Sequence, residues 1–213
     1  MSRNLPKIRV RRHPERGHYD RATIEQIVDE AYYCHVAVVR DGAPVIIPTL
    51  HVRVDDSLYI HGAVAAGLFK DMKQDAVVSV AITLLDGLVL ARSFYNHSAN
   101  YRSVVAFGVA REVTDPDEKL RVLKALADRV VPGRWDDARP PNDTELKITR
   151  VFAIPLDHAS VKIRTGPPSD DVDDLTRPTW AGVIPLKMQV GQPQPDPLQQ
   201  PPMPLPDYLN QNI

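Results

Sequence analysis

The stretch 58–70 carries the residues of this chain that are best placed for chemistry. A strand pattern there ends at a histidine, and a helix pattern follows after several small residues. The start of a helix leaves backbone N–H groups free, and such groups bind phosphate. This junction can therefore hold a phosphate, and whether it binds a phosphorylated cofactor is the central question that the sequence raises. Its candidate binding residues are His61, Gly62, Ala63, Ala66, Gly67 and Lys70.

Histidines form a second set of candidate residues. His61 ends the strand beside the junction and is the candidate catalytic residue, and His51 ends the β-rich run before it. Together with His97 they match no standard ligand spacing, so we predict no site for a bare metal ion. The alternative for each is a histidine that only forms a structural hydrogen bond.

Composition excludes several classes of partner and reaction. A formal net charge of −1 gives no global field for nucleic acid or membrane lipid, so we expect neither partner. No apolar run reaches membrane-spanning length. Cys34 is the only cysteine, which excludes an intrachain disulfide and fits a reducing cytoplasm. Because no P-loop, dinucleotide fingerprint or Ser–His–Asp pattern is visible, the chemistry would belong to a bound cofactor.

Hydrophobic periodicity predicts the elements that position these residues. The expected strands are 35–40, 45–54, 58–62, 77–85, 104–113, 151–155 and 159–164. The expected helices are 20–33, 64–74, 115–130 and 143–149. Asp86-Gly87 is expected to form a turn before the apolar run 88–91. Short strands with hairpin turns predict a mainly β fold, a small antiparallel barrel with helices outside it.

Composition along the chain predicts three regions. Residues 1–19 form a polar, basic arm, and residues 20–166 form the barrel. Residues 167–213 form a proline-rich extension, which cannot pack a core of its own. Because its stretch around Trp180 is apolar, we expect the extension to dock on the barrel or on a partner subunit.

Seven short pieces of sequence carry a family resemblance through their order and spacing. They are 20–24, 34–37, 47–49, 59–62, 84–93, 100–105 and 180–183. The chain resembles the pyridoxamine 5′-phosphate oxidase-like, FMN-binding split-barrel superfamily. Within it, the chain is most similar to the flavin-nucleotide-binding branch that includes nitroimidazole-resistance proteins.

The resemblance implies a six- to seven-stranded antiparallel split barrel with flanking helices, assembled as a homodimer with two FMN sites at the subunit interface. It implies that the flavin ring lies along the strand that contains Ile47, Pro48, Thr49 and His51. It also implies that the phosphate binds at the start of the helix 64–74. The partner subunit would contribute the segment Asn100, Tyr101, Arg102 and Ser103.

The chain departs from the family pattern at Ala66 and Gly67, where relatives commonly carry Ser-Arg. Arginine binds phosphate through charge-assisted, often bidentate hydrogen bonds. Loss of such a contact costs on the order of 1.5–3 kcal/mol. Lys70 stays available one helical turn after Gly67.

Three functional hypotheses follow. The first is an FMN-binding oxidoreductase that acts on a small molecule, with FAD as the alternative flavin. The second is a haem-binding split barrel with His61 or His51 as the axial ligand, because the resemblance implies that some relatives bind haem instead of flavin through one histidine. The third is a cofactor-free or degenerate small-molecule-binding protein, which the loss of the Ser-Arg pair motivates.

Overall fold

The computed structural model describes residues 5–72, 76–199, 201 and 203–210 of the chain. The strands are β1 (Gly17–His18), β2 (Tyr33–Arg40), β3 (Ala43–Val54), β4 (Ser57–Ala63), β5 (Ala76–Leu90), β6 (Ser98–Glu112), β7 (Thr149–Pro155), β8 (Ala159–Arg164) and β9 (Gly182–Pro185). The helices are α1 (Arg21–Glu30), α2 (Gly67–Asp71), α3 (Pro116–Val130), α4 (Arg134–Asp137), α5 (Asp143–Ile148) and α6 (Asp207–Asn210). Short 3-10 turns cover Pro14–Arg16, Phe94–Asn96 and Val172–Asp174.

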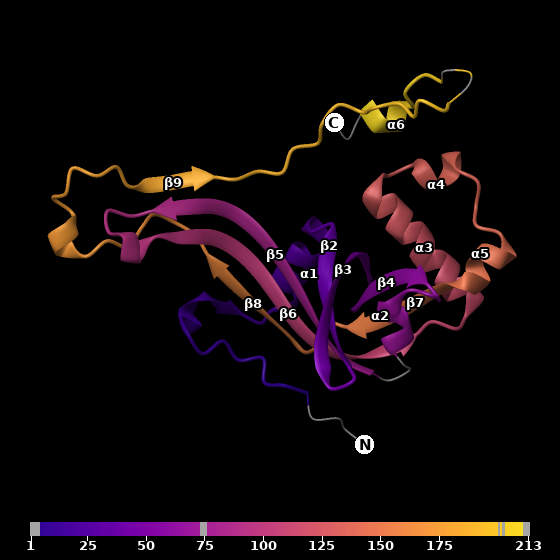
Figure 1. Cartoon of the computed structure of the whole chain (residues 1–213), viewed down its shortest axis with the longest axis horizontal. Helices are drawn as coiled ribbons and strands as arrows, with labels where there is room; N and C mark the ends of the chain where they lie inside the picture. Colours follow the sequence, from indigo (N-terminus) through magenta and orange to yellow (C-terminus); the bar gives the residue numbers. More distant parts are fainter. Residues whose placement is uncertain (1–4, 73–75, 200, 202, 211–213) are drawn as a thin grey trace.

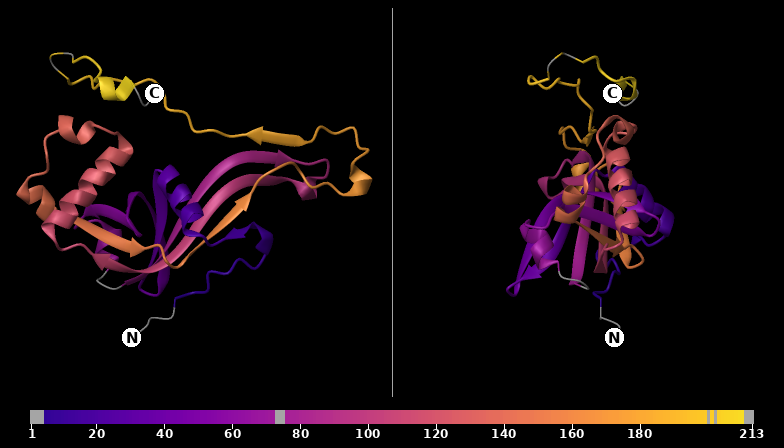
Figure 2. Two further views of the ribbon diagram at one scale, coloured as in Figure 1. Left: turned by 180° about the vertical axis from the view of Figure 1, so that it is seen from behind. Right: turned by 90° about the vertical axis from the view of Figure 1, so that its right-hand side faces the viewer.

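The strands form one antiparallel sheet that closes on itself. Its order is β1-β8-β6-β7-β4-β3-β2-β5-β9, and a further pairing of β6 with β5 completes the closure. The long strands β5 and β6 extend as a curved pair beyond the rest of the barrel (Figure 1). Helices α3, α4 and α5 gather at the opposite end of the molecule (Figure 2). The expected mainly β split barrel with flanking helices is therefore confirmed.

Two buried clusters hold the fold together. The larger cluster combines inward side chains of β2, β4, β5, β6, β7 and β8 with apolar residues of α1 and α2. The smaller cluster lies on the other face of β4, where Tyr59 and Val151 pack with Val122 of α3. Alternate residues of a strand point to opposite faces, so one strand serves both clusters. The main helices begin at capped positions, since Asp20 accepts from the N–H of Thr23 at 2.9 Å.

Some details differ from the sequence prediction. Asp86-Gly87 is not a hairpin turn, because β5 continues through it with a bulge between Leu85 and Gly87 opposite β6. Helix α2 leaves out residues 64–66 and 72 of the expected 64–74, and residues 73 and 74 lie outside the described part of the chain. Nine strands are present in the described residues because the N-terminal arm adds β1 and the extension adds β9.

The arm and the extension pack on opposite edges of the sheet. β1 pairs with β8, and β9 pairs with β5 from Gly87 to Leu90. Beyond β9 the extension runs over the molecule toward the helical end (Figure 1). There the hydroxyl of Tyr208 donates to Asp137, the last residue of α4, at 2.7 Å. The extension also contacts the body near its start, where Asp170 accepts from the backbone N–H and the guanidinium of Arg92.

Candidate functional site

At the junction between β4 and α2, an aromatic ring packs against one face of β4. A Cβ atom at Gly62 would overlap the ring of Phe69 from α2. Phe69 in turn stacks on Phe152 of β7, with 6.1 Å between ring centroids. Gly62 therefore lets α2 pack against the end of the barrel, and Ala63 follows it as the exposed last residue of β4.

His61 lies on the opposite face of β4 from Gly62, the face that Tyr59 shares with helix α3. Its ring is half-buried, and its Nδ1 atom is buried without a hydrogen-bond partner among the described residues. Burial lowers the pKa of His61, which favours the neutral imidazole. The junction residues and His61 thus face different sides of one strand.

The start of α2 has an arginine beside it that sequence reasoning missed. Ala66 is the N-cap residue and offers no side-chain cap. Arg40, at the end of β2, places its Nη2 atom 2.9 Å from the position of a Cβ atom at Gly67. Its Nε atom donates to Asp71 at 2.6 Å. Lys70 lies exposed in the same short helix, so two cations flank this turn.

The segment expected to lie under the flavin ring alternates between the core and the surface. Ile47 packs against the large buried cluster, whereas Pro48 faces outward and pairs with His35 of β2. The Thr49 hydroxyl donates to the carbonyl of Leu50 at 3.3 Å. Outward residues of this strand therefore form a surface, and inward residues support it.

His51 has a structural environment. It is 2% exposed, and its Nε2 atom lies 2.9 Å from the carbonyl oxygen of Val28 in α1. Burial lowers the pKa of His51, and the bond to Val28 opposes this shift. With the Nε2–H donating, the bond ties α1 to β3.

The segment 100–103 is held by contacts within the chain. The side chain of Asn100 donates to the carbonyl of Gly166 at 3.1 Å and accepts from Arg164 at 2.5 Å, where the barrel leads into the extension. Arg102 donates to Asp86 at 2.9 Å and to Glu30 at 2.7 Å. These bonds raise the pKa of Arg102 and lower that of Glu30. The guanidinium of Arg102 is thus already paired with the carboxylates of Asp86 and Glu30.

A groove of about 920 Å³ lies between the extension and the barrel, around Arg102. Its walls come from the end of α1, from β5 and from the segment after β9. The lining residues are Glu30, Ala31, Tyr32, Tyr33, Thr83, Leu84, Leu85, Asp86, Arg102, Pro185, Leu186, Lys187, Met188 and Val190. A cavity of this volume is in the range of small-molecule and cofactor sites. Sequence reasoning missed it, because only the apolar residues of the extension hinted at a docked wall.

An exposed apolar surface adjoins the groove, and we call it the outer sheet face. It consists of outward residues of β2, β3, β5 and β6. Its large exposed apolar members are Tyr33, Val39, Ile46, Leu50, Val77, Leu85 and Val105. Tyr33 and Leu85 belong to both the face and the groove. Apolar surface of this extent is characteristic of interaction or ligand sites. Tyr101 and Ser103 are outward, half-buried residues of β6 that pair with Leu85 and Thr83.

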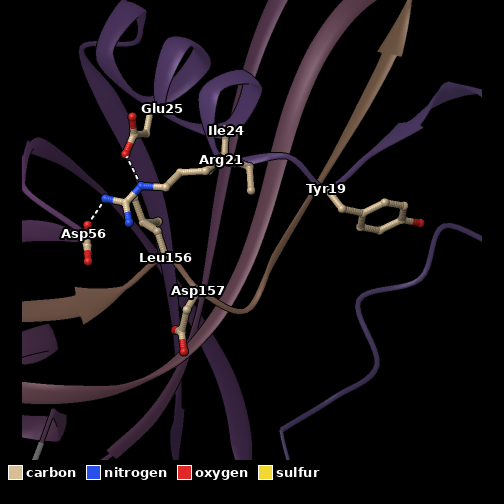
Figure 3. A pocket seen from close by; sticks show the side chains of 7 residues that line it. All are labelled: Tyr19, Arg21, Ile24, Glu25, Asp56, Leu156 and Asp157. Carbon is tan, nitrogen blue, oxygen red and sulfur yellow. Dashed lines mark hydrogen bonds and ion pairs between the residues drawn. The ribbon is translucent and has the colours of Figure 1, made fainter.

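Other features of the described chain give weaker candidates. A pocket of about 220 Å³ surrounds Arg21, whose guanidinium already contacts Glu25 and Asp56 (Figure 3). No group of three or more metal-ligating side chains occurs in the part of the chain that the structure describes. Burial raises the pKa of the Cys34 thiol to about 12, so this cysteine is not a nucleophile at neutral pH. Among the described residues, no helix has the length and apolar character needed to cross a bilayer.

Comparison with known proteins gives a family and two similar structures that extend over almost the whole chain. The model of a family described as pyridoxamine 5′-phosphate oxidase matches residues 20–163. The flavocytochrome Anf3 from Azotobacter vinelandii is 37% identical, with a TM-score of 0.90 over 97% of this chain and 98% of that one. The FAD and heme binding protein from Mycobacterium smegmatis is 35% identical, with a TM-score of 0.87 over 92% and 96%.

A third similarity concerns the fold alone. A protein from Bacteroides thetaiotaomicron, described as a candidate 5-nitroimidazole antibiotic resistance protein, is 22% identical. Its TM-score is 0.58 over 69% of this chain and 86% of that one. No curated protein matches the chain. The two structures that match almost the whole chain are therefore similar to it over the extension as well as over the barrel.

Proposed function

This chain belongs to the pyridoxamine 5′-phosphate oxidase family of flavin-binding split barrels, and we propose that it is an oxidoreductase that binds a flavin together with haem. When bound, the flavin would exchange hydride or electron pairs with a small-molecule substrate, and the haem would exchange single electrons. The chain would provide binding, orientation and exclusion of water. The sequence alone favoured FMN, with haem as an alternative to flavin. Here haem is proposed in addition to flavin.

The observation that carries this proposal is the extent of the similarity. The family model ends at residue 163, whereas the flavocytochrome and the FAD and heme binding protein cover 97% and 92% of this chain. Both proteins are at least 35% identical to this chain over an alignment that includes barrel and extension. This similarity supports the proposal that the chain binds the same kinds of cofactor as they do. The name of the second favours FAD over FMN as the flavin.

The residues of the chain fit a flavin. The start of α2 offers backbone N–H groups, with the guanidinium of Arg40 and the exposed Lys70 close by. The outer sheet face offers apolar surface on which a planar ring can lie. His61 remains the candidate catalytic residue as a prediction from sequence, and its neutral imidazole would donate or accept one proton.

We also propose that the protein is a homodimer that buries the outer sheet face. Ile46 and Val39 are 62% and 70% exposed on this face, and apolar side chains on neighbouring strands continue the surface. A second copy would remove this surface from water, and each Å² of apolar area buried contributes about 25 cal/mol. Cofactor sites at the edge of such an interface would receive residues from both subunits. The cytoplasmic location stays a prediction from the single cysteine.

The visible spectrum of freshly purified protein tests the proposal. We expect two broad flavin bands together with one intense haem band near the ultraviolet edge. The apoprotein would then be titrated separately with FAD, FMN and haemin, with flavin fluorescence, absorbance and melting temperature as readouts. A ligand that binds only the native state must raise the melting temperature. A colourless protein whose melting temperature none of the three ligands changes would instead support the cofactor-free hypothesis.

A further inference from the structure

The extension stays exposed over a long stretch after it leaves β9. Every residue from 186 to 199 is exposed, and we call this stretch the strap. Its residues 191–199 form no hydrogen bond or ion pair with any other described part of the chain, because the bonds of the last two residues both end on Asp196 of the strap itself. A Cβ atom at Gly191 would meet nothing within 4 Å. Beyond residue 190 the strap is therefore not packed on its own barrel.

The chain is nevertheless held on the body before and after this stretch. The N–H of Leu186 donates to the carbonyl of Asp86 at 3.0 Å, directly after β9 pairs with β5. In α6, Tyr208 donates to Asp137, and its Cβ atom lies 3.2 Å from the position of a Cβ atom at Gly133. A segment that is anchored on both sides has less conformational freedom to lose when it binds a partner.

The sequence of the strap favours an extended conformation. Prolines occupy positions 193, 195 and 197, and each one fixes φ and removes a backbone donor. Proline-rich segments keep an extended conformation without internal hydrogen bonds, and they bind by laying their side chains on apolar surfaces. Met188 and Leu198 are exposed side chains of this kind, and Leu198 is 85% exposed. The strap therefore has the properties of a segment that binds a surface.

The strap carries little charge, which restricts the kind of surface that it fits. Between residues 186 and 199 only Lys187 and Asp196 are charged, and the other residues are apolar, glutamine or glycine. A strongly acidic or basic partner would find few charges to pair with here. An apolar and uncharged surface is the better match.

The outer sheet face has this chemistry. Cross-strand pairing places on it the odd positions 33–39 of β2, the even positions 44–50 of β3, and the odd positions 77–85 of β5 and 101–109 of β6. None of these residues is Asp, Glu, Lys or Arg. The face therefore matches the strap both in its lack of charge and in its exposed apolar side chains.

The strap does not cover this face in its own chain, because Val39 and Ile46 remain exposed there. The strap and the face are neighbours, however, since Met188 lines the groove together with Tyr33 and Leu85 of the face. A second copy that is seated on the outer sheet face would therefore lie next to the strap. In a two-fold symmetric dimer each surface occurs twice, so each strap would meet the other copy in the same way.

We propose that the strap of each subunit crosses to a second copy of this chain and packs Met188 and Leu198 on the uncharged outer sheet face of that copy. The inference rests on the dimer part of the proposed function, and it adds a second contact to the interface between the barrels. Two straps would then clasp the dimer while β9 and α6 hold each strap on its own body. The strap is thus an arm of the dimer and not a lid over its own barrel.

Photo-crosslinking of the full-length protein tests the proposal. Leu198→Cys adds one accessible thiol, because Cys34 is buried and is the only other cysteine. The variant is labelled with benzophenone maleimide, allowed to exchange subunits with isotope-labelled unchanged protein, and irradiated. We expect covalent dimers that join residue 198 to outer-sheet-face peptides of the isotope-labelled copy. Val172→Cys, at an equally exposed position of the extension before β9, is the matched control and should give no crosslink to these peptides.

The dissociation constant of the dimer, measured by analytical ultracentrifugation over a dilution series, provides a second test. Leu198→Asp should raise it about tenfold or more, because a carboxylate would be buried on an apolar face. Leu198→Met keeps an apolar side chain of similar volume and should leave it unchanged.

Two results would overturn the assignment of the strap while the dimer itself stands. One is a set of crosslinks confined to the chain that carries the label, which would place the strap on its own barrel. The other is an equal dissociation constant for Leu198→Asp and Leu198→Met. If the unchanged protein is a monomer, the dimer part of the proposed function fails, and the strap loses its partner with it.

Discussion

The Nη2 atom of Arg40 lies 2.9 Å from the position that a Cβ atom would take at Gly67. Arg40 ends strand β2, and Gly67 begins helix α2, so two separate elements meet at the proposed phosphate end of the flavin site. The family resemblance implies an arginine at the position of Gly67 itself. Here the start of α2 has a guanidinium beside it although its own sequence contains none. The departure at Ala66 and Gly67 therefore does not leave this turn without an arginine.

The first prediction concerns Arg40→Ala. We expect about tenfold weaker flavin binding, since a charge-assisted bond to phosphate is lost. Stability should change by no more than about 1 kcal/mol, because the Arg40–Asp71 pair lies at the surface with its side chains partly exposed. Fluorescence titration and urea unfolding measure the two effects. Arg177→Ala, which removes an exposed pair with Asp174 in the extension, is the matched control. Flavin affinity equal to that of the control would remove Arg40 from the site.

The second prediction concerns Gly67→Arg. We expect roughly ten- to a hundredfold tighter FMN binding, because the variant adds a second guanidinium at the phosphate. The new Cβ atom meets only the flexible end of Arg40, which can move aside. Gly191→Arg, at an open position of the extension, controls for added charge. Unchanged FMN affinity in a folded variant would show that Gly67 does not face the phosphate.

The third prediction concerns Gly62→Ala. The added methyl group overlaps the Phe69 ring, so α2 must shift away from the barrel end. We expect a loss of about 1–3 kcal/mol in the free energy of unfolding, typical of an overpacked core. Gly191→Ala should have little effect, because nothing lies within 4 Å of its added methyl. Equal urea midpoints for the two variants would contradict the packing role of Gly62.

The fourth prediction concerns pH. Burial lowers the pKa of His61 in the folded protein below its ordinary value of 6.5, so the unfolded chain takes up the proton first. The stabilisation from neutral His61 is therefore present above pH 6.5 and is lost as the pH falls below it. Urea unfolding from about pH 7.5 to about pH 5.5 should show a steeper decline for the unchanged protein than for His61→Gln, by up to about 1.4 kcal/mol per pH unit. If the free energy of unfolding declines equally in both proteins, His61 does not carry this pH dependence.

The fifth prediction concerns the dimer. Ile46→Asp places a carboxylate on the β3 part of the outer sheet face, where burial of an unpaired charge is costly. We expect the variant to be a folded monomer by analytical ultracentrifugation. Val172→Asp, at an 81% exposed position of the extension, should remain dimeric. A dimeric Ile46→Asp protein would show that another surface forms the interface.

Much of the barrel could be predicted because its information is local. Val78, Val80 and Ile82 alternate with less buried residues along β5, and this period of two is visible in the sequence. The capping residues of α1 and α3 mark helix starts in the same way. Asp86-Gly87 misled the prediction, because the same dipeptide suits a turn and a bulge. Pairing along the whole of β5 and β6 decides in favour of the bulge.

By itself, the sequence determined the order of strands and helices, the family and the small-residue junction before α2, since each depends on neighbouring residues in the chain. Only the tertiary structure decided which side chains meet. Arg40 beside Gly67, Arg102 between Asp86 and Glu30, and the extension as a groove wall all join residues distant in sequence. The cause is barrel closure, which brings strand ends and the extension together. A local pattern predicts that a side chain faces outward, but the partner it meets depends on the whole sheet.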